Sequence, residues 1–170
     1  MMTAGRVRLV PLDRNHLNQT RQWASDPELM RLMDRQRPVT VEEHEIWFNT
    51  VVQGDDCAYF AIETLEDPAH VGNVWLWNID QRHRKAELRI VIGDEATRGQ
   101  GLGAEAIDLA CRHGFQNLGL HRVYAYVLAL NPTALRAFAR AGFGVEGTLR
   151  DDRWTGERYI DSYLLARVHL

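Results

Sequence analysis

A glycine-rich turn between two regular segments constrains the fold of this chain more than any other feature. An apolar, β-branched run at Leu88–Ile92 leads into the turn at 93–105, and a segment with helical periodicity starts near Gly101. A strand that feeds such a turn and then a helix exposes free backbone N–H groups at the helix's positive end. Glycine lets an anion approach these groups closely, so they bind phosphate without a lysine. The turn therefore predicts a phosphate-bearing ligand, with the charge of Arg98 at its rim.

Composition and charge narrow the class of protein. The chain has 170 residues, of which 45% are hydrophobic and 25% are charged, as expected for one globular domain over 1–170. A formal net charge of −3 argues against nucleic acid as a partner, since nucleic-acid binding needs a concentrated basic surface. The two cysteines, Cys57 and Cys111, are expected to be buried free thiols. No apolar run approaches about 18 residues and Met1–Leu9 has no signal-peptide pattern, so we expect a soluble cytoplasmic protein with no membrane partner.

The order of the expected elements indicates an α/β (α+β) fold. Apolar residues alternate in the segments read as strands, and helix starts are marked by Asp26 before a proline and by Thr40 three positions before Glu43. Strands cluster early and a strand–helix–strand unit lies at the centre, which predicts a mixed sheet rather than a doubly wound one. The predicted strands are 6–10, 58–62, 71–77, 87–92, 122–130, 143–154 and 159–168, and the predicted helices are 15–33 with a restart at 25–28, the segment after Thr40, 101–117 and 132–141.

Two common phosphate-binding loops fit the turn poorly. A nucleoside-triphosphate loop would end in Gly-Lys-Ser or Gly-Lys-Thr, whereas this chain has Gly101-Leu102-Gly103. The dinucleotide pattern G-x-G-x-x-A is nominally present at Gly99, Gly101 and Ala104. However, its first glycine lies well beyond the end of the strand, and the acid expected about 20 residues later is missing. A dinucleotide-binding oxidoreductase is retained as an alternative.

Coenzyme A is the third candidate ligand, and here the chain resembles a known family. Arg98-x-x-Gly101-x-Gly103 resembles the [Arg/Gln]-x-x-Gly-x-[Gly/Ala] motif of the GNAT superfamily of acyl-CoA-dependent N-acetyltransferases. The segment Asn131–Arg136, followed by Ala141–Phe143, resembles the second half of that family's cofactor region. The two motifs span about 87–143, and the order of elements extends the resemblance over nearly the whole chain. Arginine at 136 with a residue other than tyrosine at 138 is similar to the branch that acetylates the N-termini of ribosomal proteins.

The resemblance implies a GNAT-type sheet, mostly antiparallel and flanked by helices, in which two parallel strands diverge at their C-terminal ends. These strands are 87–92 and 122–130. Their divergence would leave backbone groups unpaired, and a pantetheine arm would satisfy them, because buried unpaired amides are costly. The pyrophosphate would lie on the N–H groups of the turn. The resemblance thus implies that acetyl-CoA is bound, with no metal, by Ile90, Val91, Ile92, Arg98, Gly99, Gln100, Gly101, Leu102, Gly103, Ala104, Asn131 and Arg136.

The chemistry expected at the thioester needs few protein groups. An acetyl thioester is already activated, so we expect direct transfer to a primary amine in a ternary complex. Such an amine has a pKa of about 10 and is mostly protonated at neutral pH, so a base or a water chain assists. Glu87 is the candidate base, with an ion pair to Arg89 or Lys85 as the alternative. Asn131 is the candidate for orienting the amine or a water, with a plain helix cap as the alternative. Backbone amides around Val91 or Ile92 are candidates for stabilising the oxyanion.

Two positions depart from the better-known pattern of the family. The tyrosine that many relatives carry in the second helix is replaced by Phe138, and the glutamate that some carry five residues before the asparagine is replaced by Tyr126. The usual acid and base therefore do not transfer by position, which keeps a non-catalytic CoA-binding module as an alternative. Arg136 is expected to contact a phosphate of coenzyme A or to be an ordinary exposed helix residue.

The resemblance places the acceptor between the early helices and the loop of the final hairpin. Acidic and aromatic side chains there suit a cationic amine, through charge attraction and cation–π contact. A protein N-terminus, a polyamine, an aminoglycoside-like drug and an amino sugar all remain open as acceptors, and a homodimer is left open. The residues expected to offer these contacts are Trp23, Asp26, Glu28, Glu43, Trp47, Asp151, Asp152, Arg153 and Trp154.

Overall fold

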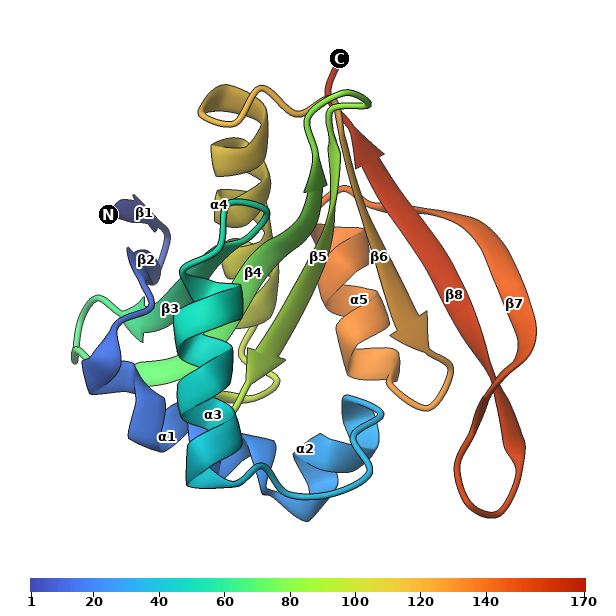
Figure 1. Cartoon of the computed structure of the whole chain (residues 1–170). Helices are drawn as coiled ribbons and strands as arrows, with labels where there is room; N and C mark the ends of the chain where they lie inside the picture. The colour runs from blue at the N-terminus through green and yellow to red at the C-terminus, as the bar shows by residue number, and fades with distance from the viewer.

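One eight-stranded sheet runs through the computed structural model, which describes residues 1–170 (Figure 1). Neighbouring strands follow the order β1-β2-β3-β4-β5-β6-β8-β7. All neighbours are antiparallel except β5 and β6, so the predicted mixed, mostly antiparallel sheet is confirmed. The strands are β1 Met2–Ala4, β2 Val7–Pro11, β3 Ala58–Thr64, β4 His70–Asp80, β5 Lys85–Ile92, β6 Arg122–Leu128, β7 Gly144–Trp154 and β8 Tyr159–Val168.

Capping side chains set several of the helix boundaries. Asp26 accepts a hydrogen bond from the N–H of Leu29 at the start of α2, and Thr40 accepts one from Glu43 at the start of α3. α4 has no side-chain cap and follows Gly101, which is in the left-handed conformation. The helices are α1 Leu17–Ala24, α2 Pro27–Leu32, α3 Val41–Trp47, α4 Leu102–Gln116 and α5 Pro132–Arg140, with 3-10 turns η1 Arg14–His16 and η3 Glu95–Thr97 and a π-helical turn η2 Phe48–Val52.

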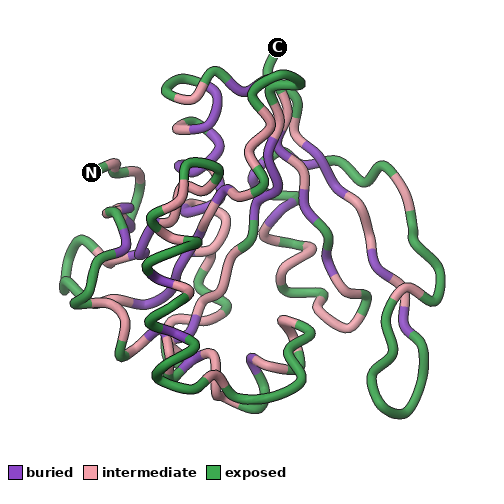
Figure 2. The backbone as a smooth tube through the Cα atoms, in the orientation of Figure 1, coloured by how far each residue is buried: buried purple, intermediate pink, exposed green.

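The helices cover the two faces of the sheet differently. In Figure 1, α4 and α5 lie behind the sheet, whereas α3 crosses in front of it. Side chains of β5 alternate between the faces, so Ala86 and Leu88 enter the core with α4 while Glu87 and Arg89 project to the opposite side. Buried segments follow the middle of the strands and α4, and the loops are exposed (Figure 2). None of the helices combines the length and the apolar run needed to cross a bilayer.

Two features differ from the sequence expectation. A short strand β1 precedes the predicted first strand and pairs Met2 with Leu9. In the segment after Thr40, the apolar residues Val41 and Ile46 suggest one buried side, yet they are 58% and 64% exposed. The buried stripe of this segment runs instead through His44 and Phe48, which are four residues apart and face the sheet together.

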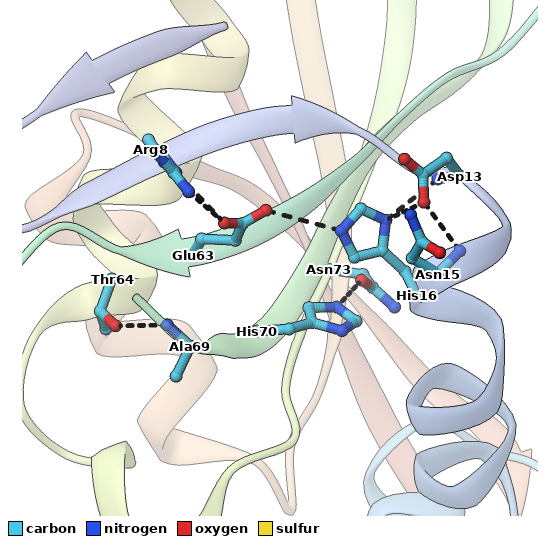
Figure 3. Close-up of polar contacts among 9 residues, drawn as sticks. All are labelled: Arg8, Asp13, Asn15, His16, Glu63, Thr64, Ala69, His70 and Asn73. Atoms are coloured by element: carbon cyan, nitrogen blue, oxygen red, sulfur yellow. Dashed lines mark hydrogen bonds and ion pairs between the residues drawn. The ribbon is translucent and has the colours of Figure 1, made fainter. Parts of the chain in front are cut away.

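Polar side chains join η1 and α1 to the start of β4 (Figure 3). Glu63 on β3 lies 3.5 Å from Nε2 of His16, and the His16 ring meets the ring of His70 edge-on. His70 and Asn73 hydrogen-bond at 2.8 Å, and the Asn73 amide donates to the Thr20 hydroxyl in α1 at 3.0 Å. Because Asn73 is 1% exposed, this chain of bonds satisfies polar groups that would otherwise be buried unpaired.

Burial lowers the pKa of His70, although its hydrogen bond to Asn73 opposes that shift. The unfolded chain therefore takes up a proton at this side chain more readily than the folded chain does. We expect the free energy of unfolding to decrease as the pH falls through about 6.5, and we expect His70→Gln to reduce that decrease. Burial lowers the pKa of His44 and His113 in the same direction, so the variant keeps part of the dependence. Urea unfolding at about pH 7.5 and about pH 5.5 measures the difference, and an unchanged pH dependence in the variant would contradict the assignment.

Candidate active site

β5 and β6 part after a short parallel pairing. The pairing runs from Lys85–Arg122 to Glu87–Tyr124, although β5 continues to Ile92. Beyond that point β6 pairs only with β8. The ends of the two strands point apart in Figure 1. The divergence that the family resemblance implied is therefore present.

The free edge of β5 presents backbone groups to the gap. The N–H of Gly93 donates to the carbonyl of Val71 on β4 at 2.9 Å. Since successive residues of a strand direct their amides to opposite sides, the amide of Val91 also faces β4. Those of Ile90 and Ile92 face the gap. The N–H groups open to a ligand thus belong to Ile90 and Ile92. Of the two amides expected to be candidates for stabilising the oxyanion, that of Ile92 faces the gap and that of Val91 does not.

The turn after β5 is open toward solvent and is held in place by hydrogen bonds from the Arg98 side chain. Gly99 and Gly101 have φ values of +79° and +84°, and a Cβ built on Gly99 would meet nothing within 4 Å. Arg98 donates from Nε to the carbonyl of Ile92 and from Nη2 to that of Gly93, both at 3.0 Å. Its guanidinium therefore ties the turn to the end of β5, while the side chain also lines the cavity described next.

A cavity of about 610 Å³ lies between this turn, the end of β5 and the start of α5. This volume is in the range of small-molecule sites. Every residue predicted to bind acetyl-CoA lines it except Gln100, whose side-chain amide donates instead to the carbonyl of Ala96. Among the lining residues that the sequence reasoning missed are Arg31, Met33 and Arg140. Arg140 could have been predicted from the sequence, because it lies four residues after Arg136 and therefore on the same side of the same helix.

A second cavity of about 210 Å³ adjoins the first and shares Leu32, Met33, Ile90, Asn131 and Ala134 with it. Its walls come from the end of α2, the gap between β5 and β6, α5 and the final hairpin. The polar side chains on these walls are Asp34, Arg89, Tyr126, Asn131, Arg153 and Ser162. The two cavities meet where β5 loses its partner strand, so a ligand in each would bring its reactive end to the same place.

Asn131 stands at this junction. Its side-chain oxygen accepts the N–H of Ala134 at 3.2 Å and caps α5, and the residue lines both cavities. The helix-cap alternative is therefore realised. It leaves the amide nitrogen of Asn131 without a protein partner, so capping and ligand contact are compatible.

Glu87, the candidate base, lies beside the cavities rather than in their lining. It is 6% exposed, and its Oε2 accepts hydrogen bonds from Trp77 Nε1 at 2.8 Å and from Arg89 Nε at 2.6 Å. The ion pair with Arg89, named as the alternative, is thus formed. Arg89 itself lines the smaller cavity and stacks over the Trp77 ring. Oε1 of Glu87 has no protein donor.

Phe138 confirms the departure expected on α5. Its ring is 3% exposed, packs edge-on against Phe143 and lines the smaller cavity without offering a hydroxyl. Tyr126 is half-exposed at the same cavity. No group of three or more His, Cys, Asp or Glu side chains is arranged to hold a metal ion.

Comparison with known proteins identifies the family. Residues 6–144 match the family described as the acetyltransferase (GNAT) domain. The spermidine N(1)-acetyltransferase of Escherichia coli K12 is 30% identical over 94% of this chain and 84% of its own length. The mouse α/β-tubulin N-acetyltransferase 9 is 26% identical over 84% of this chain and 64% of its own. The crystal structure of spermidine N-acetyltransferase from Vibrio cholerae with CoA and spermine superposes with a TM-score of 0.89 at 25% identity, covering 96% of this chain and 95% of that one.

The chain belongs to the GNAT acetyltransferase family. It is an acetyl-CoA-dependent N-acetyltransferase. The cavity geometry fits this donor, since the open Gly99, an unpaired strand edge and cationic side chains surround one space of sufficient size.

Trp23 of α1 packs directly on the start of the glycine-rich turn that follows β5. A Cβ on Gly93 would come within 2.0 Å of the indole ring, far closer than real contacts allow. Gly93→Ala is therefore expected to lower the free energy of unfolding by about 2 kcal/mol and to weaken CoA binding, because the ring or the turn must move. Gly144→Ala is the control, since its Cβ would meet nothing within 4 Å. Denaturant unfolding and calorimetric CoA titration of both variants measure the effect, and equal stability of the two would contradict it.

Proposed function

We propose that this enzyme transfers acetyl directly from acetyl-CoA to a primary amine of a polyamine, within a ternary complex. The observation that carries the proposal is the meeting of the two cavities at Ile90 and Asn131, beside the unpaired edge of β5. Two ligands bound in these spaces place a thioester and an amine side by side, and no covalent enzyme intermediate is needed.

The larger cavity is assigned to acetyl-CoA, which supplies the activated acetyl group. The backbone N–H groups from Gly99 to Ala104, at the start of α4, bind its pyrophosphate. Arg136 and Arg140 on α5 add positive charge for its remaining phosphate. The amides of Ile90 and Ile92 hold the pantetheine arm as a neighbouring strand would, and the one nearest the carbonyl stabilises the oxyanion.

The smaller cavity is assigned to the acceptor. Asp34 lines it, and Arg153 lies between Asp34 and Asp152 at 3.6 and 3.4 Å. A cationic amine competes with Arg153 for these carboxylates, which draws it toward the junction. The similarity to two spermidine acetyltransferases supports a polyamine. A protein N-terminus, the acceptor of the ribosomal-protein branch, is the second candidate, and the tubulin acetyltransferase relative supports a protein acceptor.

Cellular setting and assembly belong to the same proposal. Cys57 and Cys111 carry free thiols, which supports a reducing compartment such as the cytoplasm.

Trp154 and Tyr159, on the final hairpin, are 52% and 60% exposed. Exposed large aromatics on a hairpin support a homodimer interface there.

The test of the function is a turnover assay with acetyl-CoA and a panel of amines, read by release of the CoA thiol. Spermidine is expected to give a higher kcat/KM than an N-terminal peptide or an aminoglycoside.

Asp34→Asn is expected to raise KM for spermidine about tenfold with KM for acetyl-CoA unchanged, since one charge-assisted contact is lost. Asp55→Asn, which changes an exposed acid outside both cavities, is the control. Preference for the peptide would favour the second candidate, and tight CoA binding without turnover would favour a non-catalytic module.

Glu87 is assigned as the base, with its unoccupied Oε1 accepting the amine proton through water. Glu87→Gln is expected to lower kcat about 100-fold while KM for spermidine changes little. Glu63→Gln, which alters another paired glutamate outside both cavities, is the control. A raised KM with unchanged kcat would instead show that Glu87 only holds Arg89 in place.

A further inference from the structure

One buried polar group remains unpaired in the fold. Ser162 on β8 is 1% exposed, and its hydroxyl is the single buried side-chain oxygen or nitrogen without a hydrogen-bond partner. The residue lines the smaller cavity. Its cross-strand neighbours are Leu128 on β6 and Leu149 on β7, neither of which offers a polar side chain.

An unpaired hydroxyl in such a place weakens the folded state. Leaving a buried donor and acceptor unsatisfied costs about 1–3 kcal/mol, and an alanine of nearly the same size would remove that cost. Buried polar groups in proteins are otherwise almost always paired. The fold therefore gains nothing from the Ser162 hydroxyl, and the cavity that it lines is the place where a partner can arrive.

The acceptor amine and the sulfur of coenzyme A can both be hydrogen-bond partners of the Ser162 hydroxyl. The amine must lose a proton as its nitrogen attacks the acetyl carbon, and the departing sulfur must gain one. Three other side chains that line the smaller cavity serve this exchange poorly, since Phe138 has no hydroxyl, the Asn131 oxygen already caps α5 and Tyr126 is half-exposed. A hydroxyl both accepts and donates, so it passes a proton on without acquiring net charge.

We propose that Ser162 is a catalytic residue that relays the proton from the acceptor amine to the sulfur of coenzyme A. As the C–N bond forms and the C–S bond breaks, the nitrogen gives its proton to Oγ while Oγ gives its own proton to the sulfur. The products are the amide and the free thiol, and Ser162 returns to its starting state. This inference rests on the proposed function and adds a residue to it. Any surplus proton of the incoming ammonium leaves earlier, through Glu87.

The test compares matched variants at position 162. Ser162→Ala is expected to lower kcat about 100-fold, with KM for acetyl-CoA and for the amine changed less than threefold. Ser162→Thr and Ser162→Val add the same bulk and differ only in the hydroxyl, so Thr is expected to exceed Val in kcat by at least tenfold. Thr148→Val makes the same hydroxyl-to-methyl change at an exposed position of β7 outside both cavities, and it is expected to keep kcat within about threefold of the unaltered enzyme.

Thermal unfolding of the ligand-free proteins provides a readout that does not depend on turnover. Ser162→Ala is expected to raise Tm by about 2–4 °C, because it removes an unsatisfied group. A lowered Tm together with equal kcat for Thr and Val would overturn the proposal in favour of a packing role, as would a kcat for the alanine variant within twofold of the parent. Absence of turnover in the parent enzyme with every amine would overturn the proposed function and this inference with it, whereas the other outcomes leave that function standing.

Discussion

The parting of β5 and β6 is the constraint on which the rest of the structure depends. The two strands share backbone hydrogen bonds only near Glu87 and Tyr124, and each then runs on to a helix that starts beside the gap. α4 follows β5 through the glycine turn, and α5 follows β6 through Asn131. Two helix N-termini and one unpaired strand edge are thereby brought to a single place, which is why an anionic donor and its reactive end fit there together. No individual side chain produces this arrangement, because it is a property of strand direction and pairing.

The helices on the opposite face connect the acceptor side to the donor side. Trp23 in α1 rests on the backbone of Gly93, and its neighbour His70 belongs to the buried chain of polar contacts that fixes α1 on β4. The end of α2 supplies walls to both cavities through Leu32 and Met33. α1 and α2 therefore pack on the same turn to which phosphate binding is assigned in the proposed function, so the geometry of the larger cavity is set partly by the packing of these helices.

Sequence reasoning located most elements and most of the residues that line the larger cavity around the glycine turn, because local chemistry fixes both. Glycines that need positive φ and an Asn-Pro cap act within a few residues, so Gly99, Gly101 and Asn131 were readable from the chain alone. The failures have two causes, a local hydrogen bond in one case and contacts between distant segments in the others. Gln100 belongs to the motif, but its amide turns back to Ala96; Val41 and Ile46 look like a buried side, but the inward stripe passes through His44 and Phe48. The unpaired state of Ser162 depends on which residues lie opposite it on β6 and β7, and strand register is not written in any local pattern.

The short pairing between β5 and β6 would also make a coenzyme bound in the proposed way part of the sheet. Beyond Glu87 the amides of Ile90 and Ile92 have no protein strand opposite them, so a bound pantetheine arm would complete the sheet there. By mass action, a ligand that binds only the folded chain adds RT ln(1 + [L]/Kd) to its resistance to unfolding. The lifetime of this enzyme in a cell would then follow the size of the CoA pool, and starvation for acyl carriers would leave the protein more exposed to proteolysis as well as idle.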